Sequence, residues 1–289
     1  MRTVNMFFLL AFMSAMLFSS VFVSSALAGQ YATGFKAYGQ GDFKTAYQQF
    51  LKSAKQGNPE AQFAIGLMYG HGKGVSLDCG KAVKWYRLAA RHGEAGAECD
   101  LGFMYARGKG VTQDFTKAVK WYRLAAEQGD ADAENNLGVM HYEGKGMPRD
   151  FTKAAKWYRL AAEQGDASAQ YNLGVMHYEG KGVPRDFTKA AKWYRLAAEQ
   201  GDADAQYNLG VIYYEGKGVP RDFTKAVKWY FLAAKQGDAD AEYNLGVMFD
   251  QGKGVSQDSV EAYKWNRLAA KQGDTAAKFR QGFLYYGAK

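Results

Sequence analysis

The sequence predicts an all-α fold in which 36-residue helix-turn-helix repeats stack into a solenoid. Two observations lead to this prediction. The six tryptophans, from Trp85 to Trp265, are each 36 residues apart, and a Gly-Lys-Gly tripeptide recurs at the same interval between residues 72 and 254. A fixed period of this length is typical of stacked repeats rather than of independent globular domains.

Each repeat divides into two predicted helices, as residues 131–166 illustrate. Ala133, Leu137 and His141 recur at the four-residue spacing of one helical face. After the Gly-Lys-Gly turn, Asp150 is the expected N-cap of the second helix, and Gly165 is the expected left-handed residue that ends it. Such a helical hairpin buries its apolar face only by stacking on its neighbours.

The period also sets the predicted domain organisation. We expect a signal peptide over residues 1–28, a shorter capping unit over 29–58 and a C-terminal capping helix over 275–289. Between them lie six repeats, at residues 59–94, 95–130, 131–166, 167–202, 203–238 and 239–274.

The first 28 residues have the pattern of a secretory signal. Arg2 precedes an apolar run from Met6 to Val23, and the run Ala26-Leu27-Ala28 has the small residues of a cleavage site. The alternative is a retained membrane anchor, because about 18 apolar residues just span a bilayer. We therefore expect an exported, periplasmic or secreted protein of bacterial type, with no integral membrane span after cleavage.

Composition narrows the classes of function. The formal net charge is +8, and the chain has only two cysteines and four histidines. Two cysteines exclude a disulfide scaffold and a four-cysteine metal framework, and the few histidines leave little material for a metal enzyme. We expect no cofactor, and nucleic acid is not an expected partner of an exported chain.

The repeat also carries a family signature. Residues 205–237 read Ala-x-x-x-Leu-Gly-x-x-Tyr-x-x-Gly-x-Gly-Val, then Asp-x-x-Lys-Ala-x-x-Trp-Tyr-x-x-Ala-Ala-x-x-Gly. This pattern resembles the Sel-one-like repeat (SLR), whereas residues 31–58 resemble the related tetratricopeptide repeat (TPR). The resemblance implies a right-handed α-solenoid that acts as an adaptor or scaffold for other proteins, and it specifies no particular partner.

The resemblance leaves one enzymatic alternative, an enzyme acting on β-lactam or cell-wall substrates, because some cysteine-rich SLR proteins are described as penicillin-hydrolysing. Serine β-lactamases need Ser-x-x-Lys to place an amine beside the nucleophile. No serine of this sequence has a lysine three residues later. We therefore expect a protein that is not an enzyme.

The predicted partner-binding surface is the concave groove, which the first helices line in TPR-like solenoids. Its positions repeat as ladders of tyrosine and valine edged with carboxylates, and tyrosine is a favoured anchor for a protein or peptide partner. The alternative is that the tyrosines only pack between repeats. The predicted groove residues are Asn135, Val139, Tyr142, Glu143, Tyr171, Val175, Tyr178, Glu179, Tyr207, Val211, Tyr214, Glu215, Tyr243, Val247 and Asp250.

Three further features of the sequence have both a structural and a functional interpretation. His141 and His177 stand where other repeats carry aromatic residues, so we expect core packing rather than a ligand pair. Cys79 and Cys99 are expected to lie about 10 Å apart along the helices, too far for an unstrained bridge, although a disulfide stays an alternative. The lysines and arginines of the second helices are expected to form a basic convex face, which anionic polymers or lipid headgroups would approach.

Overall fold

The computed structural model describes residues 25–278, with side chains from residue 29 onward. Most of the predicted signal peptide (residues 1–24) and most of the predicted C-terminal capping helix (residues 279–289) lie outside the described residues. Among the helices that are described, none is long and apolar enough to cross a membrane. The chain divides into two compact units, residues 1–97 and 98–289.

The first unit is a succession of helices with its own core. Phe50, Ile65 and Met68 lie at the centre of that core, and the hydroxyls of Tyr47 and Tyr69 hydrogen-bond to each other at 2.9 Å. The helices are α2 (Ser25–Gly39), α3 (Phe43–Lys55), α4 (Pro59–His71) and α5 (Cys79–Ala90), followed by the start of α6 (Ala95–Arg107).

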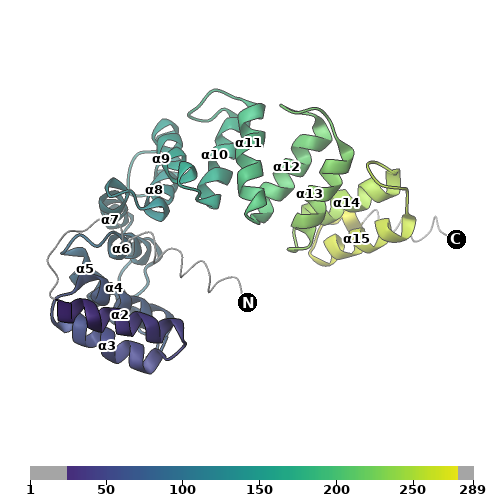
Figure 1. Ribbon diagram of the computed structural model, residues 1–289. Coiled ribbons are helices and arrows are strands. Elements are labelled where there is room, and N and C mark those ends of the chain that lie inside the picture. Colours follow the sequence, from purple (N-terminus) through teal and green to yellow (C-terminus); the bar gives the residue numbers. More distant parts are fainter. Residues whose placement is uncertain (1–24, 279–289) are drawn as a thin grey trace. The chain divides into compact units, whose positions relative to one another are not determined.

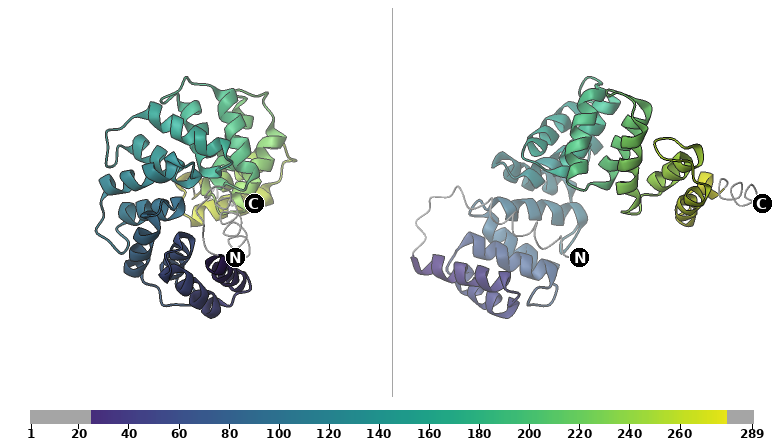
Figure 2. Two further views of the ribbon diagram at one scale, coloured as in Figure 1. Left: turned by 60° about the vertical axis from the view of Figure 1, so that its left-hand side comes forward. Right: turned by 45° about the vertical axis from the view of Figure 1, so that its right-hand side comes forward.

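The second unit continues with α7 (Phe115–Glu127), α8 (Ala131–Glu143), α9 (Phe151–Glu163), α10 (Ala167–Glu179), α11 (Phe187–Glu199), α12 (Ala203–Glu215), α13 (Phe223–Ala234), α14 (Ala239–Gln251) and α15 (Ser259–Lys271). Each first helix, such as α10, packs on the second helix of its own repeat and on the second helix of the preceding one. The teal and green helices accordingly follow one another in chain order (Figures 1 and 2). The predicted all-helical repeat fold is confirmed.

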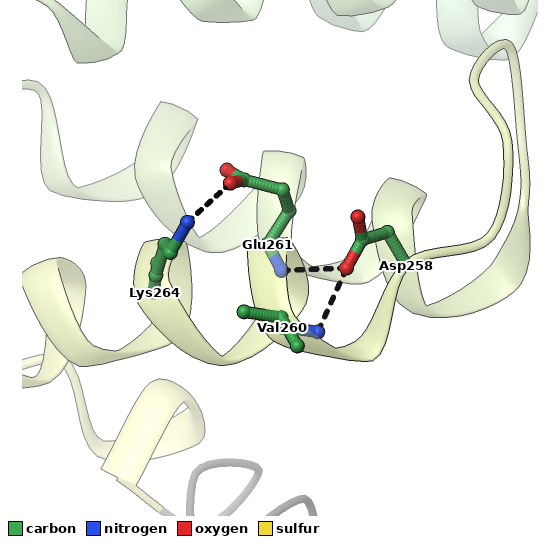
Figure 3. A network of polar contacts seen from close by, with 4 residues as sticks. All are labelled: Asp258, Val260, Glu261 and Lys264. Atoms are coloured by element: carbon green, nitrogen blue, oxygen red, sulfur yellow. Dashed lines mark hydrogen bonds and ion pairs between the residues drawn. The ribbon is translucent and has the colours of Figure 1, made fainter.

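Aspartates set the starts of the helices. Asp150 begins α9 by accepting a hydrogen bond at 2.9 Å from the Lys153 backbone N–H, and the same cap recurs in the other second helices. At α15, Asp258 accepts from two backbone N–H groups at 2.9 Å, and Lys264 pairs with Glu261 at 2.6 Å (Figure 3). Each such cap stabilises its helix by about 1 kcal/mol.

In the repeats between residues 59 and 238, a glycine of the first helix lets a tyrosine of the second helix approach closely, whereas Asn266 takes the tyrosine's place beside Gly246. A Cβ on Gly174 would lie 2.6 Å from the ring of Tyr194, which is 2% exposed. Helical spacing alone predicts that the neighbouring aromatic Trp193 is buried as well, and this is wrong in degree. Trp193 is half-buried, and the Lys192 ammonium lies 5.5 Å from its ring. Because adjacent helical residues point about 100° apart, only the tyrosine faces the glycine.

The Gly-Lys-Gly turn joins consecutive repeats through a contact that we call the lysine clasp. The Lys181 ammonium donates to the Tyr142 hydroxyl at 3.1 Å, lies 5.4 Å from the centre of that ring and pairs with Glu179 at 2.8 Å. Gly182 has a φ of +69°, and a Cβ there would collide with the Phe151 carbonyl of the preceding repeat. The clasps are Lys181 to Tyr142, Lys217 to Tyr178 and Lys253 to Tyr214.

Candidate protein-binding face

A row of aromatic side chains crosses the first helices of the second unit. The rings of Tyr171 and Tyr207 are half-buried and rest on the fully buried rings of Tyr194 and Tyr230, with centroids 5.9 and 5.8 Å apart. Burial raises the pKa of both half-buried tyrosines. One side of each ring is therefore held by the core, while part of it stays accessible.

The valines lie one helical turn further along the same helices. Val175 and Val211 are half-buried and pack against the core of the unit. We use the name first-helix face for these two rows together. It consists of Asn135, Val139, Tyr171, Val175, Tyr207, Val211, Tyr243 and Val247, all of which are half-buried.

Asparagines connect this face from one repeat to the next. Asn172 donates to the side-chain oxygen of Asn135 at 3.2 Å. Asn208 lies near the Tyr171 hydroxyl and Asn244 near the Tyr207 hydroxyl, and each amide lowers the pKa of its tyrosine, against the larger effect of burial. The sequence interpretation included Asn135 among the groove residues but gave Asn172, Asn208 and Asn244 no role, because their partners lie a full repeat away in the chain.

The remaining predicted groove residues already take part in contacts within the protein. Tyr142, Tyr178 and Tyr214 accept hydrogen bonds from the lysine clasps. The exposed glutamates that follow these tyrosines are neutralised by lysine, with Glu143 paired to Lys145 at 2.7 Å. The matching pairs are Glu179 with Lys181 and Glu215 with Lys217, and half-buried Asp250 stands at the corresponding tyrosine position.

The structure also shows a set of carboxylates that the sequence interpretation did not include. They lie at the N-terminal ends of the first helices, and we call them the aspartate edge. Within the described residues, none of them forms an ion pair with a lysine or arginine. The signal was available as the recurring Gly-Asp-Ala-Asp-Ala motif. The aspartate edge consists of half-buried Asp130, Asp166, Asp202 and Asp238 and exposed Asp132, Asp204 and Asp240.

The aspartates of the edge influence one another and the tyrosines. Burial is the main cause that raises the pKa of Asp166, and the charges of Asp132 and Asp202 raise it further. Asp204 and Asp202 likewise raise the pKa of Tyr171. The aspartates at the start of α12 therefore lie near Tyr171 of α10.

Other candidate chemical groups are buried or isolated. His141 and His177 are buried at 6% and 4% exposure, which lowers the pKa of both imidazoles. Cys79 and Cys99 are free thiols. No group of three or more potential metal ligands occurs among residues that the structure describes.

The second helices present a different surface. Leu124, Leu160 and Leu196 are 45%, 45% and 36% exposed at the same position of successive repeats. We call this row, with the exposed basic residues beside it, the second-helix stripe. Its basic residues are Lys120, Arg123, Lys156, Arg159, Lys192 and Arg195.

Comparison with known proteins identifies the repeat. A family model of the Sel1 repeat matches residues 59–94, 95–130, 131–166, 167–202, 203–238 and 239–274. An uncharacterised protein of Neisseria meningitidis is 46% identical over 48 residues, which are 17% of this chain and 10% of that protein.

Two solved structures are similar over most of the chain. The protective antigen c5321 of uropathogenic Escherichia coli, which displays an SLR fold, is 39% identical with a TM-score of 0.79 over 82% of this chain. The match spans about half, 51%, of that antigen chain. A Sel1 repeat protein from Oxalobacter formigenes is 35% identical with a TM-score of 0.75, covering 83% of this chain and 96% of that one.

Proposed function

Because the chain belongs to the Sel1 repeat family, we propose that it is an exported adaptor, not an enzyme, that binds a protein or peptide across the first-helix face. Proteins built from these repeats generally serve as scaffolds for protein interactions. The proposal places the partner on the tyrosine and valine rows of residues 135–247.

The observation that carries the proposal is the half-exposed tyrosine row. Tyr171 and Tyr207 are each partly exposed, while Tyr194 and Tyr230 pack against one side of their rings. A side chain that is already held in place loses little conformational entropy when a partner binds. Large aromatic anchors in such positions commonly provide most of the binding energy of an interface.

The experiment compares two triple variants as affinity baits. The first replaces Tyr171, Tyr207 and Tyr243 with asparagine, the residue that the chain itself carries at position 135. The matched control replaces Leu124, Leu160 and Leu196, which are exposed leucines of the second helices, with asparagine. Each bait and the unmodified protein are incubated with bacterial envelope extract and, in parallel, with host fluid.

We expect the unmodified protein and the leucine variant to retain the same protein, and the tyrosine variant to lose it by at least tenfold. The circular dichroism melting curves of all three baits should stay close together. If the leucine variant loses the partner and the tyrosine variant keeps it, the first-helix face is the wrong surface.

Export is proposed from the apolar run and the Ala26-Leu27-Ala28 pattern. Mass spectrometry of the protein recovered from the periplasm and the culture medium tests it. A new N-terminus at Gly29 is expected, and an intact N-terminus found only in the cytoplasm would contradict export.

The second-helix stripe favours an additional contact with an anionic surface. Exposed leucines flanked by lysine and arginine combine apolar insertion with charge attraction. Cosedimentation with phosphatidylglycerol vesicles is expected, and replacing Lys156, Arg159, Lys192 and Arg195 with glutamine should abolish it. Equal cosedimentation with phosphatidylcholine vesicles would contradict this contact.

A further inference from the structure

We propose that the partner segment on the first-helix face is an extended peptide rich in lysine or arginine, with its basic side chains seated between the tyrosine row and the aspartate edge. This inference rests on the proposed function and adds the chemistry of the partner.

The N-cap aspartates of the first and second helices differ in whether a lysine pairs with them. From Asp78 to Asp222, the N-cap aspartates of the second helices are paired with a lysine three residues later, as in Asp150 with Lys153 at 3.3 Å and Asp222 with Lys225 at 3.0 Å. Asp258 is the exception, because Glu261 stands where the lysine would be. Asp166, Asp202 and Asp238 cap the first helices in the same way, yet none has such a lysine within the described part of the chain. Among the described residues, the first helices therefore begin with a row of capping carboxylates that no lysine neutralises.

This edge adjoins the row of aromatic rings. Asp202, the last residue of Tyr171's own repeat, caps α12, and Asp204 lies in the first turn of that helix. Both charges are close enough to raise the pKa of the Tyr171 hydroxyl, which burial already raises. Tyr207 has the same relation to Asp238 and Asp240. The arrangement of one ring beside two carboxylates thus occurs in two consecutive repeats.

A basic side chain fits such an arrangement on physical grounds. Its methylene stem packs on the tyrosine ring, and its charge lies between two carboxylates that repel each other in the free protein. A second helix packs between neighbouring first helices, so an extended segment that crosses the face meets one such arrangement per repeat. A segment with recurring basic residues matches this repetition, whereas an acidic segment would add to the repulsion.

The test measures fluorescence anisotropy of labelled peptides on the purified protein. The probe is four copies of Lys-Ser-Thr, and the comparison probe is four copies of Glu-Ser-Thr. The first variant, which we call the groove variant, replaces the three exposed residues of the aspartate edge through Asp132→Asn, Asp204→Asn and Asp240→Asn. The capping aspartates stay intact. Ser168 at the same position of repeat 167–202 shows that a neutral residue is accommodated there.

The control variant removes the same three charges from the second helices through Glu127→Gln, Glu163→Gln and Glu199→Gln, which are all exposed. We expect the lysine probe to bind the unmodified protein, the groove variant to weaken binding at least tenfold and the control variant to change it less than twofold. Equal losses in both variants, or equal binding of the glutamate probe, would overturn the inference. If the triple variant fails to fold, Asp204→Ser provides the same comparison with a smaller expected loss of about threefold.

The two proposals fail in different ways. If the tyrosine-to-asparagine variant loses the captured partner but the lysine probe does not bind, the face is correct and its basic ligand is wrong. If neither the tyrosine nor the aspartate substitutions affect any binding, both proposals are wrong.

Discussion

Repeats 131–166 and 167–202 form a natural comparison, because they share 32 of 36 residues and differ only at 132/168, 134/170, 135/171 and 147/183. In the second of them, the buried Gln170 donates to the Ala162 carbonyl of the preceding repeat at 3.1 Å and accepts from Gln200 at 2.8 Å. In the first, buried Glu134 accepts from Gln164 at 2.8 Å. An ionised carboxylate has no hydrogen to donate, so Glu134 lacks the counterpart of the bond from Gln170 to the Ala162 carbonyl.

The difference separates what the fold requires from what it tolerates. The helix bounds, caps and glycine–tyrosine contacts are the same in both repeats, so a buried carboxylate is compatible with the architecture. Burial nevertheless raises the pKa of Glu134, which means that the folded state opposes its ionisation. Two other repeats, with Glu98 and Glu242, carry the same substitution.

The largest expected effect tests whether the two repeats pack equally. Tyr158→Ala and Tyr194→Ala should each lower the free energy of unfolding by about 3–5 kcal/mol, because each ring fills the space beside a glycine. Chemical denaturation followed by circular dichroism measures both. A difference greater than about 1 kcal/mol between the two variants would show that the shared packing is not equivalent.

The next effect depends on pH. Burial, together with the nearby charges of Asp130 and Glu127, raises the pKa of Glu98 to about 7, although the hydrogen bond from Gln128 opposes this rise. The folded protein therefore loses stability as the pH rises from about 4.5 through about 7. We expect Glu98→Gln to be more stable than the unmodified protein by on the order of 2 kcal/mol at pH 8, and equally stable at pH 4.5. Denaturation curves that differ by the same amount at both pH values would refute this cause.

Exchanging glutamate and glutamine between the two repeats tests the comparison directly. Glu134→Gln should stabilise the protein by about 1 kcal/mol at pH 8, because the amide adds the donor that Gln170 already provides. Gln170→Glu should destabilise it by a similar amount. Thermal melting of both variants checks the symmetry, and a change of the same sign in both would contradict the hydrogen-bond explanation.

The smallest effect concerns the first-helix face. Tyr171→Asn makes repeat 167–202 resemble its neighbour at this position and should change stability by about 0.5 kcal/mol or less, since substitutions of accessible side chains have small effects. The melting temperature, with Tyr194→Ala as the buried control, measures the change. A loss as large as that of the control would assign Tyr171 to the core rather than to a binding face.

Much of the fold could be predicted from local patterns. The tryptophan period, the Gly-Lys-Gly turns and the aspartate caps predicted repeating helix pairs, because each signal acts within a few residues of the helix end it determines. The burial of His141 followed from its place on an apolar face with Ala133 and Leu137. These inferences needed only helical periodicity and turn chemistry.

The candidate site was less predictable, because its contacts join residues one repeat apart. Nothing near Tyr142 indicates that Lys181, 39 positions later, donates to its hydroxyl. Trp193 and Tyr194 are adjacent and both aromatic, so the sequence did not distinguish the buried ring from the half-buried one. The aspartate edge was overlooked because each of its residues also has a local role as a helix cap or first-turn residue.

The lysine clasp has a consequence for how such a chain grows. Each clasp joins one surface of a repeat to a different surface of the next, which makes it a head-to-tail contact that never closes on itself. Inserting one more 36-residue copy would recreate the same junction on both sides and leave no surface unmatched. Duplication of one repeat at a time can therefore lengthen the first-helix face while each added junction keeps the same clasp.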